Sequence, residues 1–331
     1  MITLHRGKHY ILENQRIAPA EESAAGAEAA KEAEGKRQTL TWQVLERHNH
    51  SGDMEHLQIR FDSMGVYDNT YVGILQTAYA SGLKEFPMPC VFTNCHNCLG
   101  AVGGTINTDV HKYAESACKK SGGIFVPPHE AVIHQYMREM IINSGDMSIV
   151  SDSHTRYGTQ GSLSIGEGGP ELAKAMLGKY YEIDYPEVIA VFLTGAPKPW
   201  VGPMDVALSI IGKVFKNNFV KNKVLEFVGP GVKSLSMDFR NGIDTMTTES
   251  ACLSSIWAMY VTASVQEQEN NSSTIKSNRT MSNEIFVAFA TQKGGIGKST
   301  VTALAASYLH NVQGHNVAVI DCDAQIGRAH V

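Results

Sequence analysis

Three short polar clusters in the sequence carry the residue types of acid–base chemistry. They are residues 93–97, 151–155 and 245–250, and each holds histidine, aspartate or glutamate beside hydroxyl side chains. The first two follow apolar runs, and the third follows the turn-like pair Asn241-Gly242. In open α/β sheets, polar side chains just past the carboxyl end of a strand line the ligand crevice. Asp, His and Glu placed there can form a general acid–base set.

A different chemistry is indicated near residue 300. Residues 293–300 read KGGIGKST, in which the glycines let backbone amides surround a phosphate. Lys298 would supply positive charge and Ser299 could bind Mg²⁺. Such a loop works between a strand and the helix that follows it, and residues 281–331 leave room for roughly one βαβ unit. We therefore expect this loop to describe only the C-terminal part of the chain.

The composition predicts a globular protein with a sizeable core. A chain of 331 residues suggests two domains at ~150 residues each. A net charge of −5 gives no electrostatic reason to expect nucleic acid or an anionic membrane as a partner. We find no apolar segment of signal-peptide length at the N-terminus and no apolar run of ~18 residues. We expect no membrane span and a cytoplasmic location.

The cysteines are spread too widely to predict a disulfide framework. Cys90, Cys95 and Cys98 match the C-x4-C-x2-C spacing of a plant-type ferredoxin loop. That loop needs a fourth distant cysteine, and its small-fold context is absent here. We favour buried structural thiols, or one thiol that lines a site.

Changes in composition divide the chain into four parts. Short apolar runs, such as residues 188–193 and 224–228, alternate with helical patterns and predict an α/β fold with a largely parallel sheet. Residues 18–36 are rich in Ala and Glu without an apolar stripe, which indicates a solvated insert. The predicted parts are an N-terminal arm at 1–39, the α/β region at 40–257, a polar linker at 258–280 and the phosphate-loop unit at 281–331.

The second cluster and its surroundings resemble the signature region of the aconitase superfamily. The resemblance follows the order His96, His134, Asp152-Ser153-His154-Thr155, residues 229–232 and Thr248-Glu249, and it covers about residues 68–257. It implies a three-layer α/β domain and a hydro-lyase that adds or removes water across a small hydroxy acid. It also implies an iron–sulfur cluster whose open iron binds the substrate hydroxyl.

The resemblance also implies a role for each matching residue. His96 would protonate the leaving hydroxyl, and Asp152, His154 and Glu249 would hydrogen-bond that hydroxyl or water. Ser153 would meet a substrate carboxylate, with His134 as a supporting histidine.

Two departures limit what the resemblance carries over. The family's aconitases place an aspartate directly before the first histidine, where it orients and charges the imidazole, and Cys95 stands there instead. The family's cluster cysteines lie beyond the matching residues, so the iron–sulfur ligands remain unknown. We expect an incomplete domain that is inactive as this chain.

The C-terminal unit resembles the ParA/MinD-like partitioning ATPases over residues 284–325. The resemblance implies a site for ATP and Mg²⁺ formed by Lys293, Gly294, Gly295, Gly297, Lys298, Ser299, Thr300 and Asp323, with Ser299 on the metal. Residues 326–331 no longer fit that family and indicate a junction. We therefore interpret the chain as a chimera of an aconitase-like hydratase and the start of a ParA-like ATPase.

Three functional hypotheses follow from these patterns. The first is a hydro-lyase of a hydroxy acid, the second is an ATP-binding partitioning protein, and the third is a non-catalytic module that binds small acids. Substrate identity and oligomeric state do not follow from the sequence.

Overall fold

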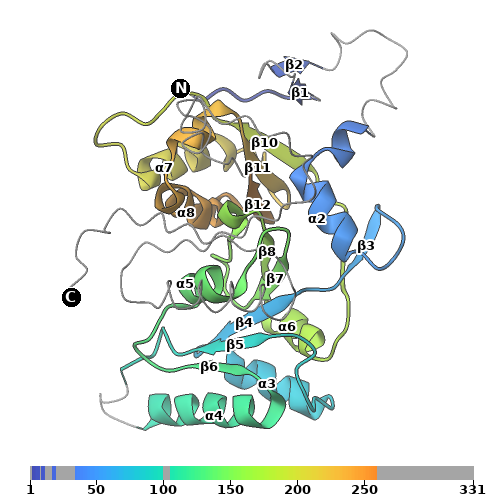
Figure 1. Ribbon diagram of the computed structural model, residues 1–331, viewed down its shortest axis with the longest axis vertical. Coiled ribbons are helices and arrows are strands. Elements are labelled where there is room, and N and C mark those ends of the chain that lie inside the picture. The colour runs from blue at the N-terminus through green and yellow to red at the C-terminus, as the bar shows by residue number, and fades with distance from the viewer. Residues whose placement is uncertain (1, 8, 12–16, 20–33, 100–104, 259–331) are drawn as a thin grey trace, which may run out of the picture. The chain divides into compact units, whose positions relative to one another are not determined.

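The computed structural model describes residues 2–7, 9–11, 17–19, 34–99 and 105–258. The chain divides into two compact units, Met1–Ser264 and Val265–Val331, and all described residues lie in the first (Figure 1). The phosphate-binding loop and the βαβ unit expected around it lie outside the described residues.

A parallel sheet forms the centre of the first unit. Its described strands lie in the order β6-β5-β4-β7-β8, and every neighbouring pair is parallel. The strands are β4 (Ser63–Tyr67), β5 (Cys90–Thr93), β6 (Ile124–Val126), β7 (Met147–Val150) and β8 (Leu163–Gly166). Every residue of β5 and β7 is buried, as expected for parallel strands that are covered on both faces.

Helices cover both faces of this sheet. Cys90 and Phe92 of β5 belong to a core shared with α3, α4 and α6, whereas Val91 belongs to a core shared with α5. The helices are α3 (Tyr71–Ala80), α4 (Ile106–Ser121), α5 (Ile133–Tyr136) with a π-helical turn at Met137–Ile141, and α6 (Gly169–Met176). The predicted three-layer α/β architecture is confirmed for this unit.

A smaller parallel sheet holds β10, β11 and β12 in that order. The strands are β10 (Val188–Phe192), β11 (Val224–Val228) and β12 (Ser254–Trp257), and the first two confirm the strands predicted from the sequence. The helices α7 (Pro203–Val214) and α8 (Met237–Met246) share its apolar core. The helix α2 (Leu40–His48) begins at β11, where the buried Glu226 carboxylate accepts hydrogen bonds from the first backbone N–H groups of the helix.

The turn predicted at Asn241-Gly242 is wrong. Both residues lie inside α8, where a Cβ on Gly242 would stand 2.7 Å from Pro203 at the start of α7. Close packing of the two helices therefore overrides the local turn preference of this pair. The chain then turns through η5 (Thr247–Ser250) directly into β12.

The remaining elements are short. They are two antiparallel pairs, β1 (His9–Ile11) with β2 (Ile17–Pro19) and β3 (His56–Ile59) with β9 (Tyr181–Asp184), and two 3-10 turns, η3 (Gly158–Gln160) and η4 (Pro230–Ser234). Across the described part of the chain, we find no helix with the length and apolar character needed to cross a membrane.

The order of the large sheet determines where a ligand can bind. The chain runs outward from β4 through β5 to β6 and then returns to the other side of β4 to form β7 and β8. The connections after β4 and β7 therefore leave the sheet in opposite directions, which opens a crevice at the carboxyl ends of these two strands. The polar clusters at residues 93–97 and 151–155, which follow β5 and β7, lie at this edge of the sheet.

The end of β8 controls the position of the loop after β7. A Cβ added to Gly166 would lie 2.1 Å from the carbonyl oxygen of Asp152, so Gly166→Ala must displace that loop. We expect a loss of about 1–3 kcal/mol in the free energy of unfolding, measured by urea denaturation. Gly73→Ala is the matched control, because Gly73 is exposed in α3 and its Cβ would meet nothing within 4 Å. This control should gain up to about 1 kcal/mol, and equal stability of the two variants would contradict the close approach.

Candidate active site

Asp152 is the centre of the polar cluster at the carboxyl end of β7. Its Oδ1 accepts a 2.7 Å hydrogen bond from the backbone N–H of His154 and lies 3.3 Å from Nε2 of His134. The Nδ1 atom of His154 is 3.5 Å from the same oxygen. Nε2 of His96 approaches the other oxygen, Oδ2, at 4.0 Å. Three imidazoles therefore surround one carboxylate, whose side chain is 12% exposed.

The surroundings of Asp152 keep it ionised. Burial acts to raise the pKa of its carboxyl, but the hydrogen bonds from His134 and the His154 N–H, with the charges of both imidazoles, lower it to about 2. The site therefore holds a fixed negative charge at neutral pH, with three imidazoles placed around it.

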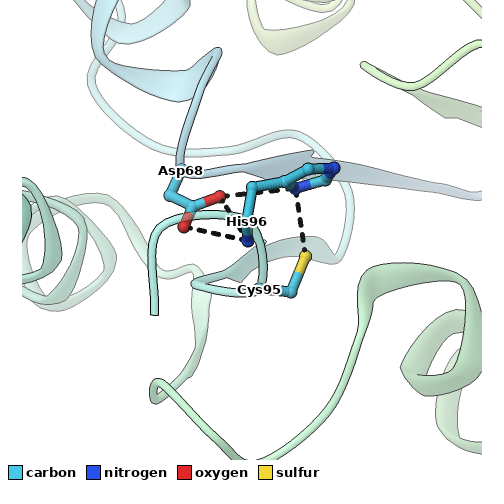
Figure 2. Close-up of side chains that lie close together, drawn as sticks. All are labelled: Asp68, Cys95 and His96. Carbon is cyan, nitrogen blue, oxygen red and sulfur yellow. Dashed lines mark hydrogen bonds and ion pairs between the residues drawn. The ribbon is translucent and has the colours of Figure 1, made fainter. Parts of the chain in front are cut away.

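A buried aspartate at the end of β4 anchors His96. The side chain of Asp68 is fully buried, and its oxygens accept hydrogen bonds from the backbone N–H groups of His96 and Asn97. Asp68 Oδ1 also lies 3.5 Å from Nδ1 of His96 (Figure 2). The Tyr67 ring packs on the imidazole with 4.2 Å between centroids. In aconitases an aspartate directly before the first histidine orients the imidazole, and Cys95 occupies that position here. Asp68, at the end of the neighbouring strand, provides a carboxylate beside His96 instead.

Glu249 reaches the site from η5, before the smaller sheet's last strand. Its Oε1 lies 3.0 Å from Nε2 of His154, and the hydroxyl of the adjacent Thr248 donates to the Ser153 carbonyl. The clusters around His96 and Asp152 follow the ends of strands, whereas Glu249 follows the end of the helix α8. The side chain of Ser153 is exposed, with its Oγ 3.5 Å from Nδ1 of His154.

The ring of His134 is oriented by Tyr157. Burial strongly raises the pKa of the Tyr157 hydroxyl, which therefore keeps its proton and lies 3.1 Å from Nδ1 of His134. When this hydroxyl donates to Nδ1, the proton of the neutral imidazole lies on Nε2 and points at Asp152. Neither Tyr157 nor Asp68 was a sequence-predicted site residue. Asp68 does carry a recognisable signal, because it directly follows the apolar end of a strand.

The described cysteines do not form an iron–sulfur ligand set. Cys90 and Cys118 are buried in the core of the large sheet, and Cys252 is buried with its thiol donating to the Thr247 carbonyl. Burial raises the pKa of the Cys90 and Cys118 thiols, to about 12 for Cys118, so both remain protonated. Only Cys95 and Cys98 are partly exposed among the cysteines in the described ranges. These thiols do not fit a cluster that requires several thiolates on one centre, and we derive no step through one.

The sequence-predicted residues of the upstream site therefore converge, whereas those of the phosphate loop are not described. His96, His134, Asp152, Ser153, His154 and Glu249 gather at one edge of the large sheet. Residues 293–300 and Asp323 lie outside the described residues.

Comparison with known proteins agrees with this geometry. The model of the aconitase family (aconitate hydratase) matches residues 42–289, which is most of the chain. This chain belongs to the aconitase family. A second model, of the CobQ/CobB/MinD/ParA nucleotide binding domain, matches residues 287–330.

Known members of the aconitase family are much longer than the matching region. The mitochondrial aconitate hydratase of Schizosaccharomyces pombe is 31% identical over 214 residues, which are 62% of this chain and 27% of the relative. The mitochondrial aconitate hydratase of Saccharomyces cerevisiae is 28% identical over the same shares of both chains. An aconitase-ribosomal protein bL21m fusion protein of S. pombe is 29% identical over 61% of this chain and 23% of its own length. This chain thus spans about a quarter of the length of the curated relatives it matches.

The low pKa of Asp152 gives a testable titration. We expect its carboxyl to titrate near pH 2 in a carboxyl-carbon NMR experiment, and His134→Ala to raise this value because it removes the main hydrogen bond. The folded-state pKa lies below the ordinary 3.8, so ionised Asp152 stabilises the fold above about pH 4. That contribution is lost as the pH falls towards about 2.

His56→Ala is the control for this titration. His56 forms an exposed ion pair with Asp184 on β3 and β9, away from the site, so the variant should leave the Asp152 titration unchanged. An ordinary pKa for Asp152 in the unmodified protein would contradict the described geometry.

Proposed function

We propose that the Asp152 site belongs to a hydro-lyase that adds or removes water across a small hydroxy acid. The observation that carries this proposal is the gathering of three imidazoles around one ionised carboxylate at the crevice of the parallel sheet. Membership of the aconitase family supports it. The names of the relatives point to aconitate and its hydrated acids as the substrate class.

His96 is the proposed acid for the leaving hydroxyl. Asp68 Oδ1 lies 3.5 Å from its Nδ1, and its Nε2 faces the crevice near Asp152. In dehydration the C–O bond breaks, and the Nε2 proton leaves with the hydroxyl as water. In the same reaction a base takes the proton from the neighbouring carbon, and the C–H electron pair forms the double bond.

Asp152, His154 and Glu249 are the proposed binding groups for the hydroxyl or water. They form a continuous chain in which His154 lies between the two carboxylates. Such a chain fixes the orientation of the imidazole and of both carboxylates, whose remaining oxygens can accept a hydrogen bond from the hydroxyl or water of a bound substrate. The exposed hydroxyl of Ser153 at the same edge is suited to a substrate carboxylate.

The test of this function is ligand binding to the chain itself. Aconitate or its hydrated acids should raise the thermal midpoint, and His154→Ala should weaken the measured binding about 10–100-fold, since a hydrogen bond to a charged group is lost. His56→Ala, the exposed histidine variant, should bind as the unmodified chain does. Unchanged binding by His154→Ala would exclude the assigned site.

A parallel optical assay of aconitate hydration distinguishes the two upstream hypotheses when it is made on a full-length family member that contains this region, because this chain alone is expected to be inactive. Loss of the carbon–carbon double bond would support the hydro-lyase. Stabilisation by the acid without any hydration would favour the non-catalytic binding module.

The C-terminal family match supports a second candidate function. We propose that residues 287–330 are the start of a ParA-like ATP-binding unit, with Lys293, Lys298 and Ser299 at the phosphates and Mg²⁺. ATP binding with Mg²⁺, measured by calorimetry, should weaken at least about tenfold in Lys298→Ala, because the phosphates lose a charged partner. Lys276→Ala, outside the phosphate loop, is the control. Absence of ATP binding at millimolar concentration would end this second proposal.

We also propose that the protein is located in a reducing compartment, namely the cytoplasm. Free thiols at Cys90, Cys95, Cys98, Cys118 and Cys252 support this. The mitochondrial relatives make the matrix the competing location, and cell fractionation separates the two.

A further inference from the structure

Three different metal-ligating side chains meet at the carboxyl ends of β4 and β5. Asp68 contributes a carboxylate oxygen, Cys95 a thiol sulfur and His96 a ring nitrogen, and these atoms lie within 4.8 Å of one another (Figure 2). Asp68 follows β4, while Cys95 and His96 follow the adjacent strand β5. The parallel pairing of these two strands therefore brings the three side chains together.

The spacing of the ligand atoms fits a tetrahedral metal ion. Cys95 Sγ lies 3.4 Å and Asp68 Oδ1 3.5 Å from Nδ1 of His96. A zinc ion with bonds of about 2.3 Å to sulfur and about 2.0 Å to nitrogen and oxygen separates neighbouring tetrahedral ligands by roughly 3.3–3.6 Å. Two of the three ligand separations therefore already match a tetrahedral site, and the third, between Cys95 Sγ and the Asp68 carboxylate, lies within 4.8 Å.

Neighbouring groups hold the three side chains in place. The backbone N–H groups of His96 and Asn97 donate to Asp68, with the Asn97 bond at 2.6 Å. The Thr93 hydroxyl lies 3.5 Å from Cys95 Sγ, and the Tyr67 ring packs on His96. Such supporting contacts orient metal ligands and strengthen binding.

We propose that Asp68, Cys95 and His96 form a mononuclear site for a divalent transition metal of the zinc type. One thiolate, one imidazole and one carboxylate suit Zn²⁺ or Co²⁺ and do not suit Mg²⁺ or Ca²⁺, which prefer oxygen ligands. Three protein ligands leave one coordination position for water or a small ligand. This site is distinct from an iron–sulfur cluster, because it contains a single thiol.

Occupation of this site changes the chemistry available to His96. A metal on Nδ1 occupies the ring nitrogen that faces Asp68 and excludes a proton from that atom. The ion would therefore compete with the acid form of His96 in the proposed hydro-lyase. Metal binding itself does not rest on that function and is measured without turnover.

The test is a Co²⁺ titration of the metal-free chain. Co²⁺ should produce a thiolate-to-metal charge-transfer band together with visible bands of tetrahedral intensity, and Zn²⁺ should displace both. Cys95→Ser should abolish the charge-transfer band. Asp68→Asn and His96→Gln should weaken Co²⁺ binding at least about tenfold, since each removes one ligand.

Cys98→Ser is the matched control, because Cys98 is also partly exposed and lies three positions along the chain. It should retain the full charge-transfer band. Circular dichroism checks that each variant is folded. If Asp68→Asn fails to fold, the comparison of Cys95→Ser with Cys98→Ser still tests the proposal. A charge-transfer band that is absent in the unmodified chain, or lost equally in Cys98→Ser, would overturn the proposal.

Discussion

The ionised carboxylate of Asp152 is the interaction on which the candidate site depends. It lies two residues beyond the buried end of β7, beside the crevice between β4 and β7. Its charge is held by a backbone N–H and an imidazole, so it does not need a lysine or arginine partner. Histidines from the loop after β5, from α5 and from the loop after β7 can therefore all face the Asp152 carboxylate. The glycine at the end of β8 leaves the space in which the Asp152 carbonyl lies. Backbone packing thus determines the position of the charge.

A second buried carboxylate connects the smaller sheet to this site. Asp244 on α8 accepts hydrogen bonds from Ser255 and Trp257 of β12 and from the backbone N–H of Gly158. Burial raises the pKa of Asp244, while these hydrogen bonds and the nearby arginines act in the opposite direction. Because α8 continues directly into η5, fixing α8 against η3 and β12 also fixes Glu249 beside His154. The two carboxylates have different tasks: Asp244 joins elements together, whereas Asp152 remains accessible to the crevice.

The sequence predicted the parts of this arrangement that depend on local pattern. The strands at 188–193 and 224–228, and the convergence of clusters that follow strands, were visible as apolar runs with polar ends. The partner of His96 was not predicted, because Asp68 is 28 residues away and reaches His96 only through strand pairing. Tyr157 was missed because it is 23 residues from His134, and the two meet only through the packing of the loop before η3 against α5. The turn assigned to Asn241-Gly242 failed because helix packing outweighed a preference of about 1 kcal/mol. Long-range pairing, which no local pattern encodes, set the remaining geometry.

The pairing of β4 with β5 also explains why a cysteine is tolerated beside His96. If the charge that orients the imidazole had to come from the preceding residue, Cys95 would leave the ring without a fixed anionic partner. Asp68 provides that charge from the neighbouring strand, and the backbone N–H groups of His96 and Asn97 hold it there. Residue 95 therefore does not need to be an aspartate. The sulfur of Cys95 lies 3.4 Å from Nδ1 of His96, the ring nitrogen that also faces Asp68. In the metal site proposed above, an ion would bind this atom, Nδ1 of His96. The carboxylate of Asp68 would also suit a hard ion, so the thiol of Cys95 is the ligand that would favour a softer transition metal.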